Sequence, residues 1–422
     1  MDDSENRVSV LHPDIWNTNN RRSAQHSLDE AVSLALAMNL EVAHQLVVPL
    51  KKPQAGLLFG KGKLEELAAI FQADDIGLVI IDGPVTPIQQ RNLEKQWGVK
   101  VLDRTGLILE IFGDRAATRE GVLQVDLAAL SYQKTRLVRS WTHLERQRGG
   151  LSFVGGAGES QLEADRRAID DAIVRLKRQL AKVVKTRTLH RSARKKIPYP
   201  IVALVGYTNA GKSTIFNHIT GASVMAKDML FATLDPTMRS VELPSGREII
   251  LSDTVGFISD LPTELVAAFR ATLEEVLDAD LILHVRDIAD PETEEQSRDV
   301  MEILGKLGIE DQAQDAIVEV WNKIDLVEAD KSKQLFTIAN RNDRIVTTSA
   351  VTGQGIAELL DVIELNLLET TVTETLKLTF SEGKRRAWLF DHNVVDAEKQ
   401  IDIGFEVTVT WTAKLAAQFQ NV

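Results

Sequence analysis

The segment between residues 201 and 220 combines glycines, a lysine and hydroxyl groups in a spacing suited to phosphate binding. An apolar, strand-like run leads directly into Gly206-Tyr-Thr-Asn-Ala-Gly-Lys212-Ser213, after which helical sequence begins. Glycines at both ends allow the backbone to curl around a phosphate, so that amide N–H groups point at it. Lys212 would contact the β- and γ-phosphate oxygens, and the Ser213 hydroxyl would bind Mg²⁺. Strand, loop and helix together predict a nucleoside triphosphate site.

A second motif indicates which base is bound. A strand-like run ends in Asn322-Lys323-Ile-Asp325. The Asp325 carboxylate can accept hydrogen bonds from both the N1–H and the exocyclic amine of guanine, whereas adenine offers no such donor pair on that edge. The Lys323 stem can cover the base, and a backbone amide within Ser349-Ala-Val351 can reach the guanine carbonyl. The motif therefore predicts guanine specificity.

Two segments between these motifs are expected to respond to the γ-phosphate. A buried-strand pattern ends in Asp253-Thr-Val-Gly256. Asp253 would hold Mg²⁺ through water, and the Gly256 amide would contact the γ-phosphate. Upstream, Phe231-Ala-Thr233-Leu-Asp-Pro-Thr237 offers two threonines as the second hydroxyl on Mg²⁺, and spacing alone does not choose between them. Loops that the γ-phosphate orders and hydrolysis releases form a switch.

The hydrolysis step is expected to be unusual. Many GTPases place a water-orienting glutamine directly after the Asp-x-x-Gly glycine, and here that position is Phe257. A phenylalanine cannot orient water by hydrogen bonding, so the chain either orients its water in another way or hydrolyses slowly until a partner helps. Asn209 is a candidate ligand for a monovalent cation such as K⁺ that would share the charge-stabilising role. The alternative is that Asn209 caps the loop locally.

These motifs require a strand–helix framework, and the sequence supplies one in several parts. Residues 1–120 alternate between short strands and helices, which predicts a small, mostly parallel α/β sheet. The expected helices are residues 27–40, 63–72 and 87–97, and the expected strands are residues 42–50, 78–82 and 99–103. Residues 198–370 suit one nucleotide-binding domain. Residues 371–422 predict a small α+β domain, with strand-like runs at 375–380, 387–391 and 403–412.

Residues 121–197 are expected to form a basic helical hairpin. Apolar residues recur at helical spacings from Leu123 to Leu144 and again from Leu162 to Val183, with a glycine-rich break between them. Residues 134–196 hold 17 Lys and Arg against 6 Asp and Glu, a net charge of +11, while the remainder carries −23. A phosphate backbone is the natural partner of such a segment. The alternative is an ordinary solvated helical surface.

Composition excludes several classes of protein. The chain of 422 residues has no cysteine, so disulfides, thiol catalysis and cysteine-based zinc fingers are ruled out. The acidic, polar N-terminus is unlike a signal peptide, and no apolar run approaches the roughly 18 residues of a membrane helix. We therefore expect a cytoplasmic protein without stable membrane insertion.

With these residues in view, the chain resembles the HflX family of bacterial ribosome-associated GTPases over nearly its whole length. The most specific similarities lie outside the general nucleotide motifs. They are Asp103-Arg-Thr-Gly-Leu-Ile-Leu109, the stretch from Arg136 to Gln147, and Gly158-Glu-Ser-Gln-Leu-Glu-Ala-Asp-Arg-Arg167. The chain departs from the family at the hairpin tip, where many members have Arg-Gly-Pro-Gly-Glu and this sequence has Val154-Gly-Gly-Ala-Gly158-Glu.

The resemblance implies GTP and GDP as ligands, Mg²⁺ as cofactor and Thr233 as the switch threonine on the metal, beside Ser213 and Asp253. Lys212, Asn209 and Gly256 are the predicted catalytic residues. The complete set of predicted nucleotide contacts is Gly206, Tyr207, Thr208, Asn209, Ala210, Gly211, Lys212, Ser213, Thr214, Phe231, Ala232, Thr233, Leu234, Asp235, Asp253, Thr254, Val255, Gly256, Asn322, Lys323, Asp325, Ser349, Ala350 and Val351.

The resemblance also implies binding to the large ribosomal subunit and GTP-dependent splitting of stalled or idle ribosomes. Off the ribosome the protein is expected to be a monomer. The resemblance and the distribution of charge together make six arginines candidate contacts to ribosomal RNA: Arg136, Arg139, Arg146, Arg148, Arg166 and Arg167. The alternatives are a GTP-dependent RNA-binding assembly factor without splitting activity, a membrane-associated regulator, and a general nucleotide hydrolase, which Asp325 disfavours.

Overall fold

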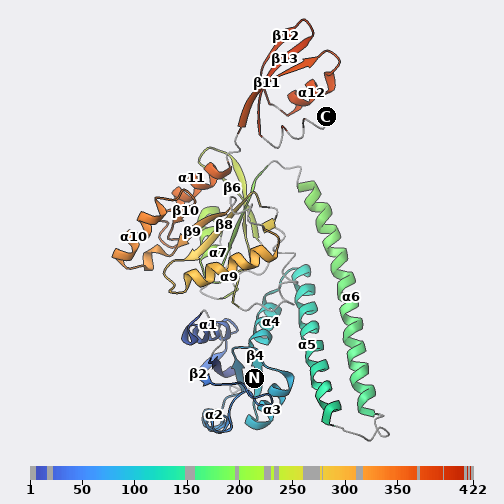
Figure 1. Cartoon of the computed structure of the whole chain (residues 1–422), viewed down its shortest axis with the longest axis vertical. Coiled ribbons are helices and arrows are strands. Elements are labelled where there is room, and N and C mark those ends of the chain that lie inside the picture. Colours follow the sequence, from blue (N-terminus) through green and yellow to red (C-terminus); the bar gives the residue numbers. More distant parts are fainter. Residues whose placement is uncertain are drawn as a thin grey trace. The chain divides into compact units, whose positions relative to one another are not determined.

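The computed structural model describes most of the chain, in two compact units: residues 1–362 and 363–422 (Figure 1). The described residues are 6–16, 22–147, 157–194, 199–222, 230–231, 237–259, 276–277, 279–309, 317–367, 371–392, 394–412, 416 and 419. In the two long helices of the first unit, side chains are described only for residues 119–137 and 163–185. The α/β fold class with a phosphate-loop domain is confirmed, and the exact domain boundaries stay predictions.

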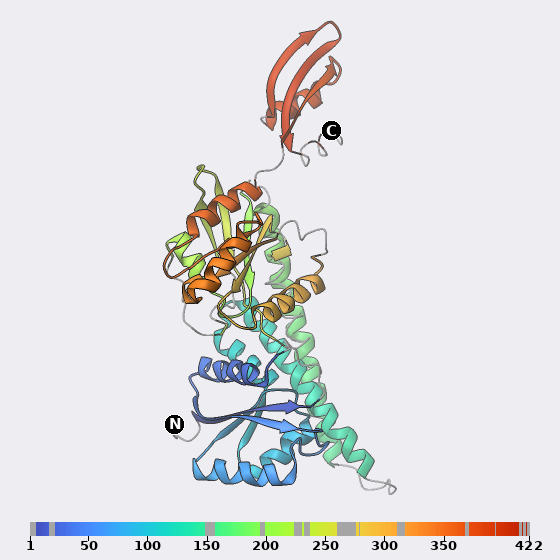
Figure 2. The same cartoon turned by 60° about the vertical axis from the view of Figure 1, so that its left-hand side comes forward.

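The first unit begins with a four-stranded parallel sheet in the order β2-β1-β3-β4. Its strands are β1 (Arg7–Ile15), β2 (Glu41–Leu50), β3 (Leu78–Ile81) and β4 (Lys100–Asp103). Helices α1 (Ala24–Ala37), α2 (Lys61–Ala73), α3 (Pro87–Trp97) and α4 (Arg104–Arg115) cover the sheet on both sides (Figure 2). The parallel sheet was predicted, whereas strand β1 and helix α4 were not.

Alternating strand residues give this sheet two apolar faces. Val8, Val10 and Ile80 belong to the core that includes α1 and α4, while Leu11 and Val79 pack with α2 and α3. A period of two sends neighbouring side chains to opposite faces, so a doubly covered parallel sheet needs apolar residues at nearly every position.

Two long helices follow, α5 (Arg119–Gln147) and α6 (Ala157–Arg194), and they run side by side as an antiparallel pair (Figure 1). In the part of these helices whose side chains are described, Leu123 of α5 is buried, and Ile169, Ile173 and Leu176 of α6 are half-buried, as expected for an apolar stripe. The predicted helical hairpin is therefore present in the structure.

The nucleotide-binding domain contains a six-stranded sheet in the order β10-β9-β8-β5-β7-β6. All neighbours are parallel except β6, which pairs antiparallel with β7. The strands are β5 (Ile201–Gly206), β6 (Thr237–Glu242), β7 (Glu248–Asp253), β8 (Leu281–Asp287), β9 (Ile317–Asn322) and β10 (Ile345–Thr347). The helices are α7 (Lys212–Thr220), α9 (Thr293–Lys306), α10 (Ala329–Ala339) and α11 (Ile356–Leu367). The phosphate, switch and base motifs follow β5, β7 and β9, so parallel pairing brings them to one edge of the sheet.

The second unit contains a three-stranded antiparallel sheet, β11-β13-β12, and helix α12. The elements are β11 (Thr371–Thr379), α12 (Gly383–Asp391), β12 (Val395–Ile401) and β13 (Gly404–Thr412). The expectation of a strand at residues 387–391 is wrong, because these residues form the end of α12. Lysine, arginine, alanine and leucine favour a helix there, and its buried residue, Leu389, packs on the sheet.

Among the described residues, no helix combines the length and apolar character needed to cross a membrane.

Candidate nucleotide site

The phosphate loop follows β5 and adopts backbone conformations that only certain residues tolerate. Gly211 has φ of 94°, in the left-handed region, and a Cβ there would lie 2.2 Å from the Asn322 Nδ2 atom. Asn209 has φ of 60° at the exposed apex, a conformation that asparagine adopts more readily than most residues. Helix α7 begins at Lys212 with no side-chain cap on its first turn. Its first amides are therefore left to bind phosphate oxygens.

Lys212 braces this loop from inside. Its ammonium group donates to the carbonyl oxygens of Gly206 at 3.1 Å and Tyr207 at 2.7 Å. Burial lowers the pKa of Lys212 to about 8, although the Asp253 carboxylate acts in the opposite direction. A phosphate group placed beside the ammonium would favour its charged form.

Ser213 and Asp253 come together where a metal ion is expected. The Ser213 Oγ donates to Asp253 Oδ2 at 2.6 Å, and the carboxylate is buried. A hydroxyl and a carboxylate are hard oxygen donors of the kind Mg²⁺ prefers, so these residues fit the ion. When bound, Mg²⁺ would neutralise charge on the phosphates. The predicted partner Thr233 lies outside the described residues, as do Ala232, Leu234 and Asp235.

The chain after β7 is held against the phosphate loop by backbone hydrogen bonds. Phe257 N–H donates to Gly206 O at 3.1 Å, and Thr208 N–H donates to Phe257 O at 2.7 Å. The Phe257 side chain is only 4% exposed and belongs to the main apolar core. Gly256 has no room for a side chain, because a Cβ would lie 2.8 Å from Thr208 Cγ2. Phe257 is thus a core residue, and its position next to Gly256 provides no polar side chain for water.

Preceding residues of the same segment are also fixed. The Thr254 hydroxyl donates to Leu204 O at 2.6 Å, and Val255 is buried in the core. Neither side chain is therefore available to the nucleotide, and any contact from this stretch must come from its backbone.

The base site is joined to the phosphate loop by Asn322. Its Nδ2 donates to Ala210 O at 2.8 Å, and its Oδ1 accepts from the Ala350 amide at 3.0 Å. Lys323 has φ of 62° and pairs with Asp287 at 2.7 Å. Asn322 therefore acts as a brace between the phosphate and base motifs.

Asp325 lies in a short 3₁₀ turn and is exposed, so its carboxylate is accessible to a ligand. The amides of Ser349 and Ala350 already donate to Gln354 O and to Asn322. Of the three amides predicted to reach the guanine carbonyl, only that of Val351 has no protein acceptor in the described part of the chain. Val351 is 80% exposed.

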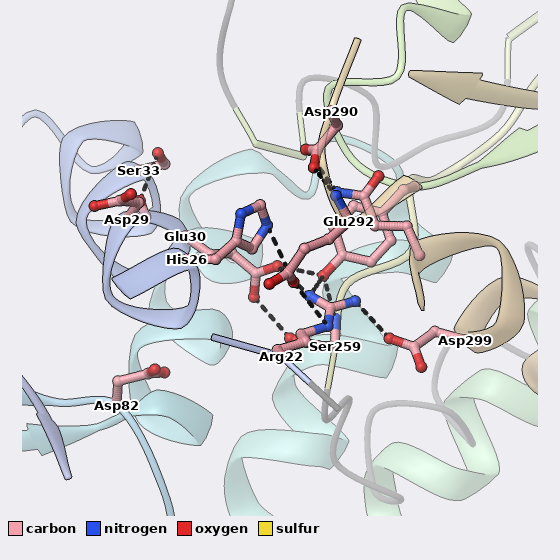
Figure 3. A network of polar contacts seen from close by, with 12 residues as sticks. Arg22, His26, Asp29, Glu30, Ser33, Asp82, Ser259, Asp290, Glu292 and Asp299 are labelled. Atoms are coloured by element: carbon pink, nitrogen blue, oxygen red, sulfur yellow. Dashed lines mark hydrogen bonds and ion pairs between the residues drawn. The ribbon is translucent and has the colours of Figure 1, made fainter. Parts of the chain in front are cut away.

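A buried charged network, which sequence reasoning did not predict, surrounds the side chain of Tyr207, a phosphate-loop residue. Figure 3 shows Arg22, Glu30, Ser259 and Asp299, which belong to this network. The Tyr207 hydroxyl donates to Glu30 of α1 and accepts from the Arg22 guanidinium and the Ser259 amide, each at 2.8 Å. Arg22 also pairs with Asp299 of α9 at 2.6 Å. Burial, and then the Glu30 carboxylate, raise the pKa of Tyr207. The network joins the N-terminal sheet domain to the nucleotide domain.

Arg104, the first residue of α4, extends this network. It pairs with Glu30 and, at 2.7 Å, with Asp82, and it donates to the Ser259 carbonyl at 3.1 Å and hydroxyl at 2.9 Å. His12 contacts Asp82 at 2.7 Å. Burial alone would raise the pKa of Glu30, but Arg104, the Tyr207 hydroxyl and Arg22 outweigh it and hold that pKa below its ordinary value. All three polar groups of Ser259 are therefore bonded within the network.

A second contact holds Phe231, two residues before Thr233, the predicted switch threonine. Arg115, at the end of α4, donates to the carbonyl of Phe231 at 2.5 Å and also to that of Leu230. The Phe231 ring, 2% exposed, packs edge-to-face on Phe112 with 4.6 Å between centroids. Phe231 also has φ of 56°, which is strained for a bulky residue. Its side chain therefore anchors the segment to α4 and is not directed at the nucleotide.

The candidate RNA contacts are distributed unequally. Arg136 is occupied internally, because it pairs with Asp103 at 2.5 Å and lies over the Tyr132 ring. The prediction that Arg136 contacts RNA is therefore replaced: this residue links α5 to the N-terminal sheet. Arg166 and Arg167 are exposed on α6. The side chains of Arg139 and Arg146, and the whole of Arg148, lie outside the described residues.

The fold and the site together define a P-loop GTPase. Four family models match successive parts of the chain: a GTP-binding GTPase N-terminal region (25–113), its middle region (115–194), a 50S ribosome-binding GTPase (201–323) and an HflX C-terminal domain (334–421). The chain belongs to the HflX family of GTPases and hydrolyses GTP.

Several relatives are similar over most of their length. A GTPase HflX of Magnetococcus marinus is 49% identical over 90% of this chain and 85% of its own. The GTPase HflX of Escherichia coli is 43% identical over 88% and 86%. A putative GTP-binding protein 6 of Xenopus laevis is 34% identical over 93% and 75%. A crystal structure of a protein named SsGBP in complex with GDP shares the fold, with a TM-score of 0.50 and 24% identity over 85% of this chain and 98% of that one.

Proposed function

We propose that the GTP-bound protein binds the large ribosomal subunit and splits stalled or idle ribosomes, and that hydrolysis resets it. The match to a family described as a 50S ribosome-binding GTPase supports the choice of partner. The model of the middle region matches the helical hairpin of this chain, and the HflX C-terminal model matches its end, so the supporting similarity is not confined to the nucleotide domain.

One observation carries the proposal: side chains of the N-terminal sheet domain hold both segments that should respond to the γ-phosphate. Arg115 and Phe112 contact Phe231, two residues before Thr233, and Arg104 and Glu30 contact Ser259, three residues after Gly256. Loops that rearrange with the γ-phosphate would change these contacts. The nucleotide state would thereby alter the position or rigidity of the N-terminal domain, which is a force-transmitting step that splitting needs.

The basic hairpin is the proposed RNA-binding element. Arg166 and Arg167 are exposed and lie one after the other on α6, where a phosphate backbone can approach them. Arg167 also pairs with Glu163 at 3.3 Å, but a surface pair of this kind is worth little and can be exchanged for phosphate. Arg139, Arg146 and Arg148 stay candidates on sequence grounds.

Splitting is tested by light scattering of intact ribosomes mixed with the full chain and a nonhydrolysable GTP analogue. We expect scattering to fall with the analogue and to be unchanged with GDP. Binding to isolated large subunits without loss of scattering from intact ribosomes would instead identify an RNA-binding assembly factor.

RNA contact is tested by the salt dependence of ribosome affinity. Replacing Arg166 and Arg167 by glutamine should reduce the slope of log affinity against log salt by about 0.7–0.9 for each phosphate group that these arginines bind. The matched control is Arg298→Gln, which removes an exposed arginine from α9 of the acidic nucleotide domain. Affinity that does not respond to salt would contradict the proposed role of the two arginines.

A further inference from the structure

Lys323 and Asp287 form an ion pair at the edge of the predicted base site. The Lys323 ammonium group donates to Asp287 Oδ2 at 2.7 Å. The two side chains are only 21% and 17% exposed, whereas those of the surface pair Lys333 and Asp330 in the same domain are 79% and 95% exposed. A pair that is largely withdrawn from water is screened less than a surface pair.

The Asp287 carboxylate is itself held in place. Asp287 is the last residue of β8, where it lies opposite Asn322 of β9. Its second oxygen, Oδ1, accepts from the Ala289 amide at 3.1 Å, and the Ile288 amide donates to Asn322 O at 3.0 Å. The carboxylate is therefore attached to the two strands that position the base motif.

The backbone of Lys323 is fixed at the other end of this side chain. Its φ of 62° lies in the left-handed region, which a lysine adopts only at a cost. On one side of it the Asn322 side chain donates to Ala210 O, and on the other the Ile324 amide donates to Thr348 O at 3.1 Å. The four-carbon stem of Lys323 is thus held between a fixed backbone and a fixed carboxylate.

A lysine stem that is held at both ends suits a flat, apolar ligand surface. An unpaired lysine samples many rotamers, and ordering it when a ligand binds reduces the affinity. Asp325, the residue expected to accept hydrogen bonds from guanine, lies two residues after Lys323 in the 3₁₀ turn. The stem is therefore already ordered beside the turn that is expected to read the base.

A purely structural role for the pair would be to join β8 to β9. The parallel ladder already joins these strands, and Arg286 of β8 pairs with Glu319 of β9 at 2.8 Å. The two strands therefore have other contacts that hold them together.

We propose that Asp287 is a positioning residue for nucleotide binding, which holds the Lys323 stem ready to cover the guanine base before the nucleotide arrives. It acts through Lys323, by reducing the side-chain entropy that is lost on binding. The proposal rests on the assignment of Asp325 to guanine, which places the base beside this turn. Because GTP and GDP share the base, Asp287 contributes equally to the affinity for both and leaves the chemical step unchanged.

The test uses Asp287→Asn, which removes the charge and keeps an oxygen for the Ala289 amide, and Lys323→Met, which keeps an apolar stem and removes the ammonium group. The variant with both changes completes a double-mutant cycle. The full chain is assayed for affinity toward GDP and a nonhydrolysable GTP analogue, for the single-turnover rate at saturating GTP, and for the free energy of unfolding in urea.

Two further variants separate the reasons for a negative result. Asp290→Asn is the matched control, since it makes the same change three residues further on, at a carboxylate bonded to Gln296 and to the Glu292 amide. Asp325→Asn tests the base site on its own.

Asp287→Asn should weaken the binding of GDP and of the analogue by the same factor, about fivefold to tenfold, with an unchanged rate at saturating GTP. Lys323→Met should lose a similar amount. The double variant should bind about as weakly as either single variant, because Asp287 acts only through Lys323. Asp290→Asn should bind both nucleotides as the wild type does.

Three outcomes would overturn the role of Asp287. Wild-type affinity in Asp287→Asn together with a loss in Asp325→Asn would leave the base site intact and make the ion pair structural. Losses that multiply in the double variant would show that Asp287 does not act through Lys323. Unchanged affinity in both Asp287→Asn and Asp325→Asn would show that the base site itself lies elsewhere.

Discussion

The phosphate loop and the charged network share one residue, Tyr207, yet they use different chemical groups. The loop uses backbone amides, glycines and a lysine from one short segment. Tyr207 contributes its main-chain carbonyl to the loop, where it accepts a hydrogen bond from Lys212. The network uses the hydroxyl of the same tyrosine, with Glu30 and Arg22 lying 177 and 185 residues away in the sequence. The residues of the phosphate loop are neighbours in the sequence because one short segment wraps around the ligand. The residues of the network come from distant parts of the sequence, which the fold brings together where two domains meet.

The two regions also differ in how they respond to substitutions. A backbone-built site tolerates many side-chain changes, since its donors are peptide groups. A buried charged network depends on each member, because removing one carboxylate leaves buried guanidinium groups with less compensating negative charge. Replacements in the network should therefore affect folding, and replacements in the motifs should affect ligand binding.

The largest effect is expected for Glu30→Ala. It leaves Arg104 and Arg22 without the carboxylate they share, and removing one partner of a buried pair costs about 3–5 kcal/mol. Urea unfolding followed by tryptophan fluorescence measures the change. Asp330→Ala, which breaks an exposed pair with Lys333, is the control and should change the free energy of unfolding by less than about 0.5 kcal/mol. Similar losses in both variants would remove the distinction between network and surface.

The second largest effect is expected for nucleotide affinity when Asp325 in the predicted base site is replaced. Asp325→Asn replaces an acceptor pair for guanine by a side chain with a competing donor, so GTP affinity should fall about 10²-fold, or about 3 kcal/mol. The asparagine amide matches the carbonyl at C2 of xanthine, so affinity for XTP should rise in the variant. Equilibrium binding of the two nucleotides checks both changes, and the free energy of unfolding should stay at the wild-type value. Unchanged GTP affinity would contradict the role of Asp325.

A third prediction concerns acid. Burial would raise the pKa of Asp82, but Arg104 and then His12 outweigh it and hold that pKa below its ordinary value. The unfolded chain therefore takes up the proton first as pH falls, so the stabilisation is complete above about pH 4 and is lost below it, by about 1.4 kcal/mol for each unit of depression. Asp82→Asn should flatten the loss of stability between pH 5 and pH 3, measured by urea unfolding. An equally steep loss in the variant would show that other carboxylates control it.

Much of the nucleotide site could be predicted from sequence because its parts are contiguous. Gly211, Lys212 and Asn322 act through backbone shape and short reach, and each motif follows directly on a strand. The core role of Phe257 was not predicted, but the absence of a polar group at its position was.

The network could not be predicted in this way. Glu30 stands in an ordinary amphipathic helix, and nothing near it indicates a partner in a phosphate loop far along the chain. Arg136 shows the same problem, since a charge count cannot separate an arginine paired with Asp103 from one that faces solvent. Arg104 is the member of the network that the sequence could have indicated, because it is a charged residue between a buried strand and an apolar helix.

Strand β1 was missed for a related reason. His12 and Pro13 interrupt its apolar pattern, and proline is unusual in a central strand. The structure accommodates Pro13 because β3 pairs only with Val8 to Leu11, so the proline lies beyond the last ladder position on that side. Such an exception depends on the length of a neighbouring strand, which local sequence does not contain.

The smallest effect tests whether the phosphate loop also uses a side chain. Asn209 is exposed at the loop apex with φ of 60°, where its amide oxygen could bind a K⁺ ion beside the phosphates. We expect hydrolysis in K⁺ to be about fivefold faster than in Na⁺, close to 1 kcal/mol in the barrier. Asn209→Gly accepts the same φ without strain and removes the amide, so it should hydrolyse at the Na⁺ rate in either salt. Single-turnover rates at constant ionic strength measure this. Equal rates in the two salts would leave Asn209 as a local cap, and Lys212 and Ser213 as the side chains with which the loop binds its ligand.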